Sequence, residues 1–421
     1  MYEVFISYRR SDGTELARTI KEILSSDYKV FFDHSSLRDG KWKIKLDQAL
    51  SEAPVLLCLM TRDFFGEWGK PNDCIQEELN NAIDNNKVII PIQVGSEKVH
   101  IPDSIPSRIK DAIEEIQYSL VHNDQSFDRD IQAVKNRLES IVKRCRNDRR
   151  RGENEIKRAI NFLWGINGER RNLQMAYDIF NEVYQAIPYM TDALVGIGVC
   201  LKENGQQDAA ITCFKKAGDK GNGEANYLIA QIYEQMGRSP IEFGRYYDRA
   251  AYLDYAPALV IKGKEAKDYN NTEEALFYFD KAAELGDSNG LYQSALIYNE
   301  KGMAQNRMDL LQKSIDLVYK AIDAGNAEAM NYLGILYYRG EIIERNTMKA
   351  FELVSKAADA GFVLAQYNKG CMLYDGIGIA RNKKLGKEWL EYAKQNGSED
   401  ARRKLEELNK GVWNTITNLF G

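Results

Sequence analysis

The sequence predicts a doubly wound α/β domain built on a parallel sheet, followed by an all-α helical-repeat solenoid. Two observations support the first part. Continuous apolar runs recur through about residue 142, and a helix-length segment follows each run. Strands of this kind belong to parallel sheets that are covered on both faces. One observation supports the second part: after about residue 155 the strand-like runs stop and a helical repeat begins.

The predicted strands are short and apolar along their whole length. They are EVFIS at Glu3, KVFF at Lys29, VLLCLM at Val55, VIIPI at Val88 and a weaker IQYSLV at Ile116. The first run ends on Ser-Tyr-Arg-Arg, a cationic pair in an acidic chain. Because open α/β sheets bind ligands at the carboxyl ends of their strands, Tyr8, Arg9 and Arg10 are expected near a site.

The second half of the chain repeats a pattern of small residues every 32 to 39 residues. One set comprises Ala217, Ala250, Ala282, Ala321, Ala357 and Ala393, and the other comprises Gly198, Ala230, Gly263, Ala295, Gly334 and Gly370. Two small positions per repeat are what two antiparallel helices need where their backbones approach closely, and this period is typical of stacked helical arrays. The longest interval, 39 residues, predicts a longer loop near residues 301–307.

Composition limits the classes of function. The chain has 421 residues, a net charge of -5, six widely spaced cysteines and three histidines. It shows no metal-ligand spacing and no run long enough to cross a membrane, so we expect a cytoplasmic protein with free thiols and no metal. Nucleic acid is an unlikely partner for this charge balance. No stacking aromatics interleave with the basic run KRCRNDRRR, which favours a solvated helix end or an interdomain linker, here assigned to 143–155, over a nucleic-acid or lipid patch.

Three stretches of the first domain together resemble a TIR (Toll/interleukin-1 receptor) domain over about residues 1–142. They are FISYRR at the first strand end, VFFDHSSLRDGKW at 30–42 and DCIQEELNNAIDNNKVIIPI at 73–92. The resemblance implies a flavodoxin-like fold and is greatest to the enzymatic branch, whose members cleave NAD+ at the nicotinamide–ribose bond with a glutamate in the third helix. NAD+ is then the substrate, and no cofactor is expected.

Helix geometry selects Glu78 as the candidate catalytic residue. In residues 73–84 the apolar stripe is Ile75, Leu79, Ala82 and Ile83. Glu78 lies at the edge of this stripe, where a carboxylate can face a cleft, whereas the neighbouring residue 77 lies on the polar side. The acidic-aliphatic motif of the family also falls on Glu78 and Leu79.

The resemblance implies further substrate-binding and regulatory residues. Tyr8, Arg9 and Arg10 would lie at the cleft mouth, with at least one arginine near the pyrophosphate; the alternative is that both are solvated loop charges. The other residues implied are Asp33, the mobile loop with Leu37, Arg38, Asp39 and Gly40, and Cys74. Trp42, just beyond the loop, is expected either to stack on a base or nicotinamide ring or to belong to the core. Relatives often carry tryptophan at the position of Cys74, so an aromatic wall is missing or is supplied by Trp68.

The repeats resemble Sel-one-like repeats over roughly residues 190–400, and the earlier copies are closer to tetratricopeptide repeats. We expect a solenoid at 156–410 and a capping segment at 411–421. The resemblance implies an NAD+ glycohydrolase that yields nicotinamide and ADP-ribose or a cyclic ADP-ribose. It further implies a bacterial anti-phage effector activated by TIR self-association, with a protein or ligand bound to the repeats. The alternative is a non-enzymatic TIR scaffold whose repeats bind a protein partner.

Overall fold

The computed structural model describes residues 2–32, 41–70, 73–96, 98–114, 118–122 and 124–408, without the side chains of 41–43. It divides into two compact units, Met1–Leu253 and Asp254–Gly421. The regulatory-loop residues Leu37, Arg38, Asp39 and Gly40, together with Asp33 and the predicted cap 411–421, lie outside the described residues. Trp42 falls in a helix, but its side chain also lies outside the described part.

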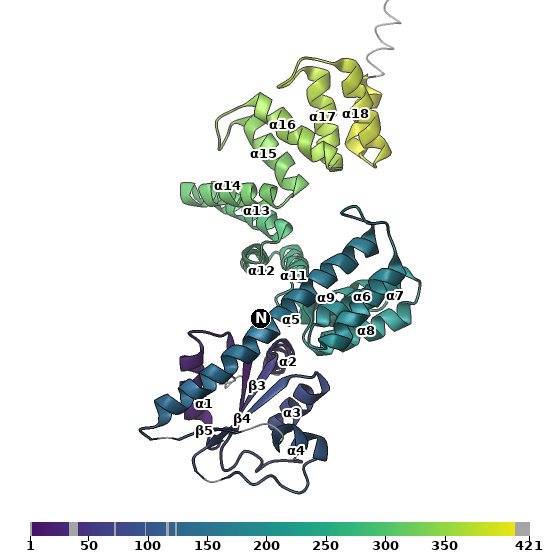
Figure 1. Ribbon diagram of the computed structural model, residues 1–421. Helices are drawn as coiled ribbons and strands as arrows, with labels where there is room; N and C mark the ends of the chain where they lie inside the picture. Colours follow the sequence, from purple (N-terminus) through teal and green to yellow (C-terminus); the bar gives the residue numbers. More distant parts are fainter. Residues whose placement is uncertain are drawn as a thin grey trace, which may run out of the picture. The chain divides into compact units, whose positions relative to one another are not determined.

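The first unit begins with a five-stranded parallel sheet in the order β2-β1-β3-β4-β5. The strands are β1 (Val4–Tyr8), β2 (Val30–Phe32), β3 (Val55–Met60), β4 (Val88–Val94) and β5 (Ser119–Val121). The helices are α1 (Thr14–Leu24), α2 (Lys41–Glu52), α3 (Cys74–Asp84), α4 (Ser107–Glu114) and α5 (Phe127–Trp164). This order confirms the predicted doubly wound fold (Figure 1).

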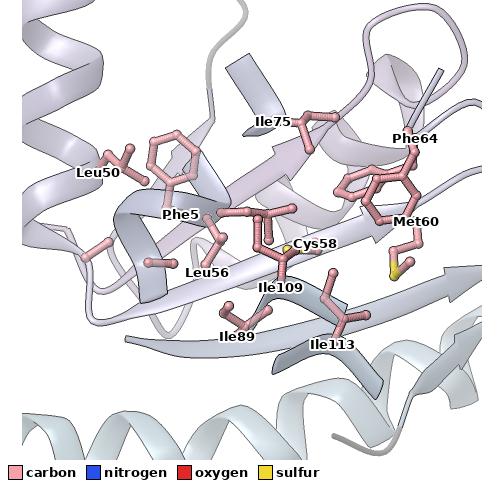
Figure 2. Close-up of a cluster of buried hydrophobic side chains, with 14 of the residues drawn as sticks. Phe5, Leu50, Leu56, Cys58, Met60, Phe64, Ile75, Ile89, Ile109 and Ile113 are labelled. Carbon is pink, nitrogen blue, oxygen red and sulfur yellow. The ribbon is translucent and has the colours of Figure 1, made fainter. Parts of the chain in front are cut away.

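Two apolar layers cover the two faces of the sheet. One layer packs side chains of α2, α3 and α4 against Phe5, Leu56, Cys58 and Met60 (Figure 2). The other packs α1 and α5 against the alternate residues of the same strands. Successive side chains of a strand point to opposite faces, which assigns each strand residue to one layer.

Helix α5 corrects the predicted linker. Residues 143–155 are not a separate connection but the middle of a continuous helix of 38 residues (Figure 1). Val142 belongs to the core of the sheet domain, and Ala159 belongs to the core of the first repeats. Gly152, which weakens an isolated helix, is buried here, and a Cβ atom at this position would lie 2.5 Å from Met190 Sδ. Close packing therefore compensates for its low helix propensity.

The first unit continues with α6 (Leu173–Ala186), α7 (Thr191–Glu203), α8 (Gln207–Asp219), α9 (Gly223–Gln235) and α10 (Pro240–Tyr252). Here the repeats touch the sheet domain directly. Lys220 Nζ donates to Asn85 Oδ1 at 2.5 Å, and Arg149 donates to the Glu52 carbonyl at 3.0 Å. Burial and the positive charges of Lys220 and Arg149 lower the pKa of Lys87 to about 7.

Gly221, in the repeats, packs closely against α2 of the sheet domain. Gly221 has a φ of +81°, in the left-handed region that favours glycine. A Cβ atom at this position would lie 2.5 Å from Gln48 Cα in α2. We expect Gly221→Ala to lower the free energy of unfolding by roughly 2 kcal/mol or more, because backbone strain and a clash act together. Thermal unfolding and hydrogen exchange of the α2 amides measure the loss.

Gly205→Ala is the matched control for this prediction. Gly205 has a similar φ of +77, but no atom lies within 4 Å of its ideal Cβ position. It carries the backbone strain without the clash. Equal destabilisation by the two variants would contradict close packing of Gly221 against α2.

The second unit consists of further repeats. Its helices are α11 (Ala256–Asp268), α12 (Thr272–Glu284), α13 (Ser288–Gln305), α14 (Met308–Asp323), α15 (Ala327–Arg339), α16 (Thr347–Asp359), α17 (Val363–Asp375) and α18 (Lys383–Gln395). The predicted loop at 301–307 is wrong, because α13 runs to Gln305 and α14 starts at Met308. The longer interval lengthens the two helices instead.

The predicted small-residue positions are confirmed as helix-packing sites in both units. All six aligned alanines, from Ala217 to Ala393, are fully buried. A Cβ atom on Gly198 or Gly263 would lie 2.5 Å from a phenylalanine ring of the adjacent helix. Small residues are therefore required where paired helices meet.

Candidate functional site

The candidate site lies at the carboxyl edge of the sheet, where β1 and β3 end beside the start of α3. Two loops are tied together there. Thr61 Oγ1 donates to Asp12 Oδ1 at 2.7 Å, and the backbone N–H of Asp63 donates to Asp12 Oδ2 at 2.9 Å. The loop after β1 and the loop after β3 thus form one connected rim.

Arg9 is committed to bonds inside the domain. Its guanidinium donates through Nε and Nη2 to the Phe64 carbonyl at 3.2 and 2.8 Å, and through Nη1 to Asp73 Oδ1 at 3.0 Å. A second carboxylate, Glu67, accepts from Nη1 at 3.2 Å. Arg9 is 8% exposed. Of the two arginines expected at the cleft mouth, Arg9 is therefore buried and joins the end of β1 to the loop after β3 and to Asp73.

This tie orients α3. Asp73 is the N-cap of the helix, and its Oδ1 atom also accepts from the Ile75 backbone N–H at 3.3 Å. A side-chain acceptor at this position satisfies one of the otherwise unpaired amides of the first turn. Arg9 and Asp73 together fix the start of α3 against the end of β1.

Glu78 and Glu77 take opposite environments, as the helix pattern predicts. Glu78 is 8% exposed and lies on the buried side of α3 with Ile75 and Leu79, whereas Glu77 is exposed. Glu78 is thus a largely desolvated carboxylate near the carboxyl edge of the sheet.

Glu78 acts electrostatically on two cysteine thiols, and Arg10 acts on one of them. Burial raises the pKa of the Cys58 thiol, and the charge of Glu78 raises it further. Partial burial, and to a smaller extent the charge of Glu78, raises the pKa of the Cys74 thiol. The positive charge of Arg10 acts in the opposite direction and lowers this pKa. Arg10 is exposed. The structure therefore brings Cys74 within electrostatic range of both Arg10 and Glu78 of the predicted site.

Tyr8 is not part of this group. Its ring stacks on Phe32 with centroids 5.1 Å apart, on the side of the sheet that α1 and α5 cover. Trp68, the alternative aromatic wall, packs at the margin of the core and meets Phe65 edge to face at 6.0 Å. The structure thus places Tyr8 on the face opposite α3.

Ser7 is a polar residue of the site region that sequence reasoning missed. It is 1% exposed, and its Oγ atom has no hydrogen-bond partner among the described residues. Its signal in the sequence is the one small polar residue of the strand VFISY, which is otherwise aliphatic and aromatic. Within the described part of the chain, no group of three or more histidine, cysteine or acidic residues is placed to hold a metal ion. None of the described helices has the length and apolarity of a membrane span.

Family models match three parts of the chain. The TIR domain matches residues 4–135, the tetratricopeptide repeat matches 191–217, and the Sel1 repeat matches 263–287, 327–362 and 363–398. These matches confirm the predicted order of a TIR domain, tetratricopeptide-like copies and Sel1-like copies.

Two curated relatives are similar to the first domain. NAD(+) hydrolase tir-1 of Caenorhabditis elegans is 34% identical over 113 residues, which are 26% of this chain and 12% of the relative. NAD(+) hydrolase sarm1 of Drosophila melanogaster is 33% identical over 94 residues, 21% of this chain and 7% of the relative. The chain thus spans only a small part of the length of either relative.

Solved structures also resemble the chain. The crystal structure of c5321, a protective antigen of uropathogenic Escherichia coli strains displaying an SLR fold, is 22% identical, has a TM-score of 0.44 and covers 61% of this chain and 56% of that chain. The Sel1 repeat protein of Oxalobacter formigenes is 18% identical and has a TM-score of 0.44, and the match covers 61% of this chain and 76% of that chain. Sequence matches and sheet topology together lead to one conclusion: the chain carries a TIR domain followed by tetratricopeptide and Sel1 repeats.

Proposed function

We propose that the TIR domain cleaves NAD+ at the nicotinamide–ribose bond and that Glu78 is its catalytic carboxylate. The observation that carries this proposal is that Glu78 is a buried carboxylate near the carboxyl edge of a parallel sheet, where its charge and that of the exposed Arg10 both act on the Cys74 thiol. Similarity to two NAD(+) hydrolases over this domain supports it.

The chemistry assigns the carboxylate an electrostatic role. The nicotinamide ring of NAD+ is a cationic pyridinium and becomes a neutral molecule when the bond to ribose breaks. Its departure therefore needs no general acid. Positive charge develops on the ribose as the bond breaks, and a fixed carboxylate stabilises that charge or holds the ribose hydroxyls. Partial desolvation strengthens this attraction, because water no longer screens it. Capture of the ribose by water gives ADP-ribose, whereas capture by an adenine nitrogen gives a cyclic product.

Arg10 is the proposed partner of the pyrophosphate. We expect Arg10→Ala to raise the KM for NAD+ roughly tenfold, with a smaller change in kcat, because a charge-assisted contact to phosphate contributes about 1.5 to 3 kcal/mol. Steady-state kinetics of nicotinamide release measure the effect.

Arg62→Ala is the control for Arg10. Arg62 is also exposed and lies on the loop after β3 at the same edge of the sheet. An equal rise in KM for both variants would assign the effect to the general positive charge of the rim and remove Arg10 from the site.

We further propose that self-association of TIR domains activates cleavage and that the repeats bring them together in response to a bound partner, as a bacterial defence against phage. Modules held together experience effective concentrations of about millimolar.

To test this proposal, the full chain is incubated with NAD+ at several protein concentrations, and the release of nicotinamide is measured. A rate that rises more steeply than the protein concentration supports activation by self-association. No release at any concentration would favour the non-enzymatic scaffold.

A further inference from the structure

Ser7 occupies a position where a hydroxyl gains nothing from packing. It is 1% exposed, and its Oγ atom has no hydrogen-bond partner among the described residues. Burying an unpaired hydroxyl costs free energy that alanine would avoid. Buried polar groups without a partner are uncommon in native structures, so this one calls for a specific explanation.

Strand geometry places Ser7 on the face of the sheet that α3 covers. Phe5, two residues earlier, packs in the core layer that contains Ile75 and Leu79 of α3 (Figure 2). Alternation puts Ser7 on the same face. In the parallel register, Ser7 is paired directly with Cys58 of β3.

Cys58 links Ser7 to Glu78. The charge of Glu78 contributes to the raised pKa of the Cys58 thiol, which places the carboxylate within electrostatic range of that residue. Helix α3 also packs directly on β1. The Ser7 hydroxyl, the Cys58 thiol and the Glu78 carboxylate thus lie between the end of β1, β3 and α3, on the same face of the sheet. Of the two neutral groups, the hydroxyl is the stronger hydrogen-bond donor.

We propose that Ser7 is a positioning residue for Glu78, donating its hydroxyl proton in a hydrogen bond to the carboxylate when NAD+ is bound. This inference rests on the proposed function. The hydrogen bond holds one carboxylate oxygen, leaves the other directed at the ribose, and favours the ionised form of the carboxyl group.

Other charged and titratable groups lie on α3 and on the elements around it. They are Arg9 and Arg10 after β1, Cys58 on β3, Glu67 on the following loop, Asp73 at the N-cap of α3, Cys74 and Glu77 on α3, Lys45 and Asp47 on α2, and Arg108 on α4. Arg9 is already bound to Asp73 and Glu67. The acidic groups oppose ionisation of the Glu78 carboxyl group, whereas a nearby cation such as Arg10 and a hydroxyl donor favour it.

The test compares Ser7→Ala with Ser294→Ala in the full chain. Ser294, on α13, is also fully buried with an Oγ atom that lacks a partner in the described structure, so it reproduces the removal of a buried hydroxyl far from the site in sequence. A purely structural hydroxyl predicts the same result for both variants: unchanged or raised thermal stability and unchanged kinetics.

We expect Ser7→Ala to lower kcat for nicotinamide release about tenfold, as loss of one charge-assisted hydrogen bond does, with little change in KM. The acid limb of its pH–rate profile moves up by about one pH unit, because the ionised carboxylate has lost a donor. Ser7→Thr, which keeps the hydroxyl, retains the wild-type pH profile, and Ser294→Ala matches wild type. Wild-type kcat and pH profile in Ser7→Ala would overturn the proposal.

Failure of the proposed function gives a different result. If the wild-type chain leaves NAD+ intact, the glutamate carboxyl groups are labelled with carbon-13 and titrated by NMR with NAD+ present. Glu78→Gln identifies the resonance of residue 78. A lower titration midpoint in wild type than in Ser7→Ala supports the role of Ser7 without catalysis, and equal midpoints overturn it.

Discussion

Glu78→Gln is expected to reduce nicotinamide release by about a thousandfold, the loss seen when a fixed electrostatic partner of a transition state is removed. Glutamine keeps the size and the hydrogen-bonding oxygen of the side chain but removes its charge. The change falls on kcat, because the positive charge on the ribose develops only as the bond breaks. Full-chain kinetics at saturating NAD+ measure it.

Glu77→Gln is the matched control for this prediction. It removes the same charge one residue earlier on the same helix, from a side chain that is exposed where Glu78 is 8% exposed. We expect activity close to wild type. A large loss in Glu77→Gln with activity retained in Glu78→Gln would reverse the assignment and show that the site lies on the other side of α3.

Arg9→Ala is expected to destabilise the sheet domain by about 3 to 5 kcal/mol, the cost of leaving one member of a buried ion pair without its partner. Asp73 has a side-chain exposure of 1% and would lose the cation that pairs with it. The Phe64 carbonyl would lose two donors in the same step. Arg9→Lys does not restore stability, because a single ammonium cannot reproduce the planar set of donors.

Hydrogen exchange of the β1 and α3 amides measures this loss within the full chain. Arg18→Ala is the control, because Arg18 lies in the same domain in an exposed pair with Glu15. Exposed pairs contribute little to stability. If Arg9→Ala instead kept normal protection of α3 and only raised the KM for NAD+, Arg9 would be a substrate ligand and the structural role would be wrong.

Local patterns predict part of the site well. The environments of Glu77 and Glu78 follow from the spacing of Ile75 and Leu79 alone, because a helix turns by a fixed angle per residue. The strands follow from continuous apolar runs in the same way. Each of these features depends on residues less than about two turns or one strand apart.

The roles of Arg9 and Arg10 depend on distant residues and could not be predicted in this way. Strand alternation groups Phe5, Ser7 and Arg9 on one side, but it does not reveal which helix covers that side. The partner of Arg9 is Asp73, 64 residues later in the chain. Only the fold shows that the first arginine is enclosed and the second is exposed.

The linker at 143–155 was mispredicted for a related reason. Its arginines and Gly152 disfavour a helix in isolation, since like charges repel and glycine has a high conformational entropy. The folded chain supplies contacts that the local sequence does not contain. Met190 packs against Gly152, and Arg149 reaches the Glu52 carbonyl.

The continuity of α5 has a geometric consequence for this chain. Every residue of an α-helix advances the chain by about 1.5 Å and turns it by about 100°. The last anchor in the sheet core, Val142, and the first anchor in the repeat core, Ala159, are therefore set at a defined angle by the number of residues between them. One inserted residue would swing Lys220 away from Asn85 by more than a quarter turn about the helix axis. The number of residues between these two anchors therefore determines the angle between the sheet core and the repeat core about the axis of α5.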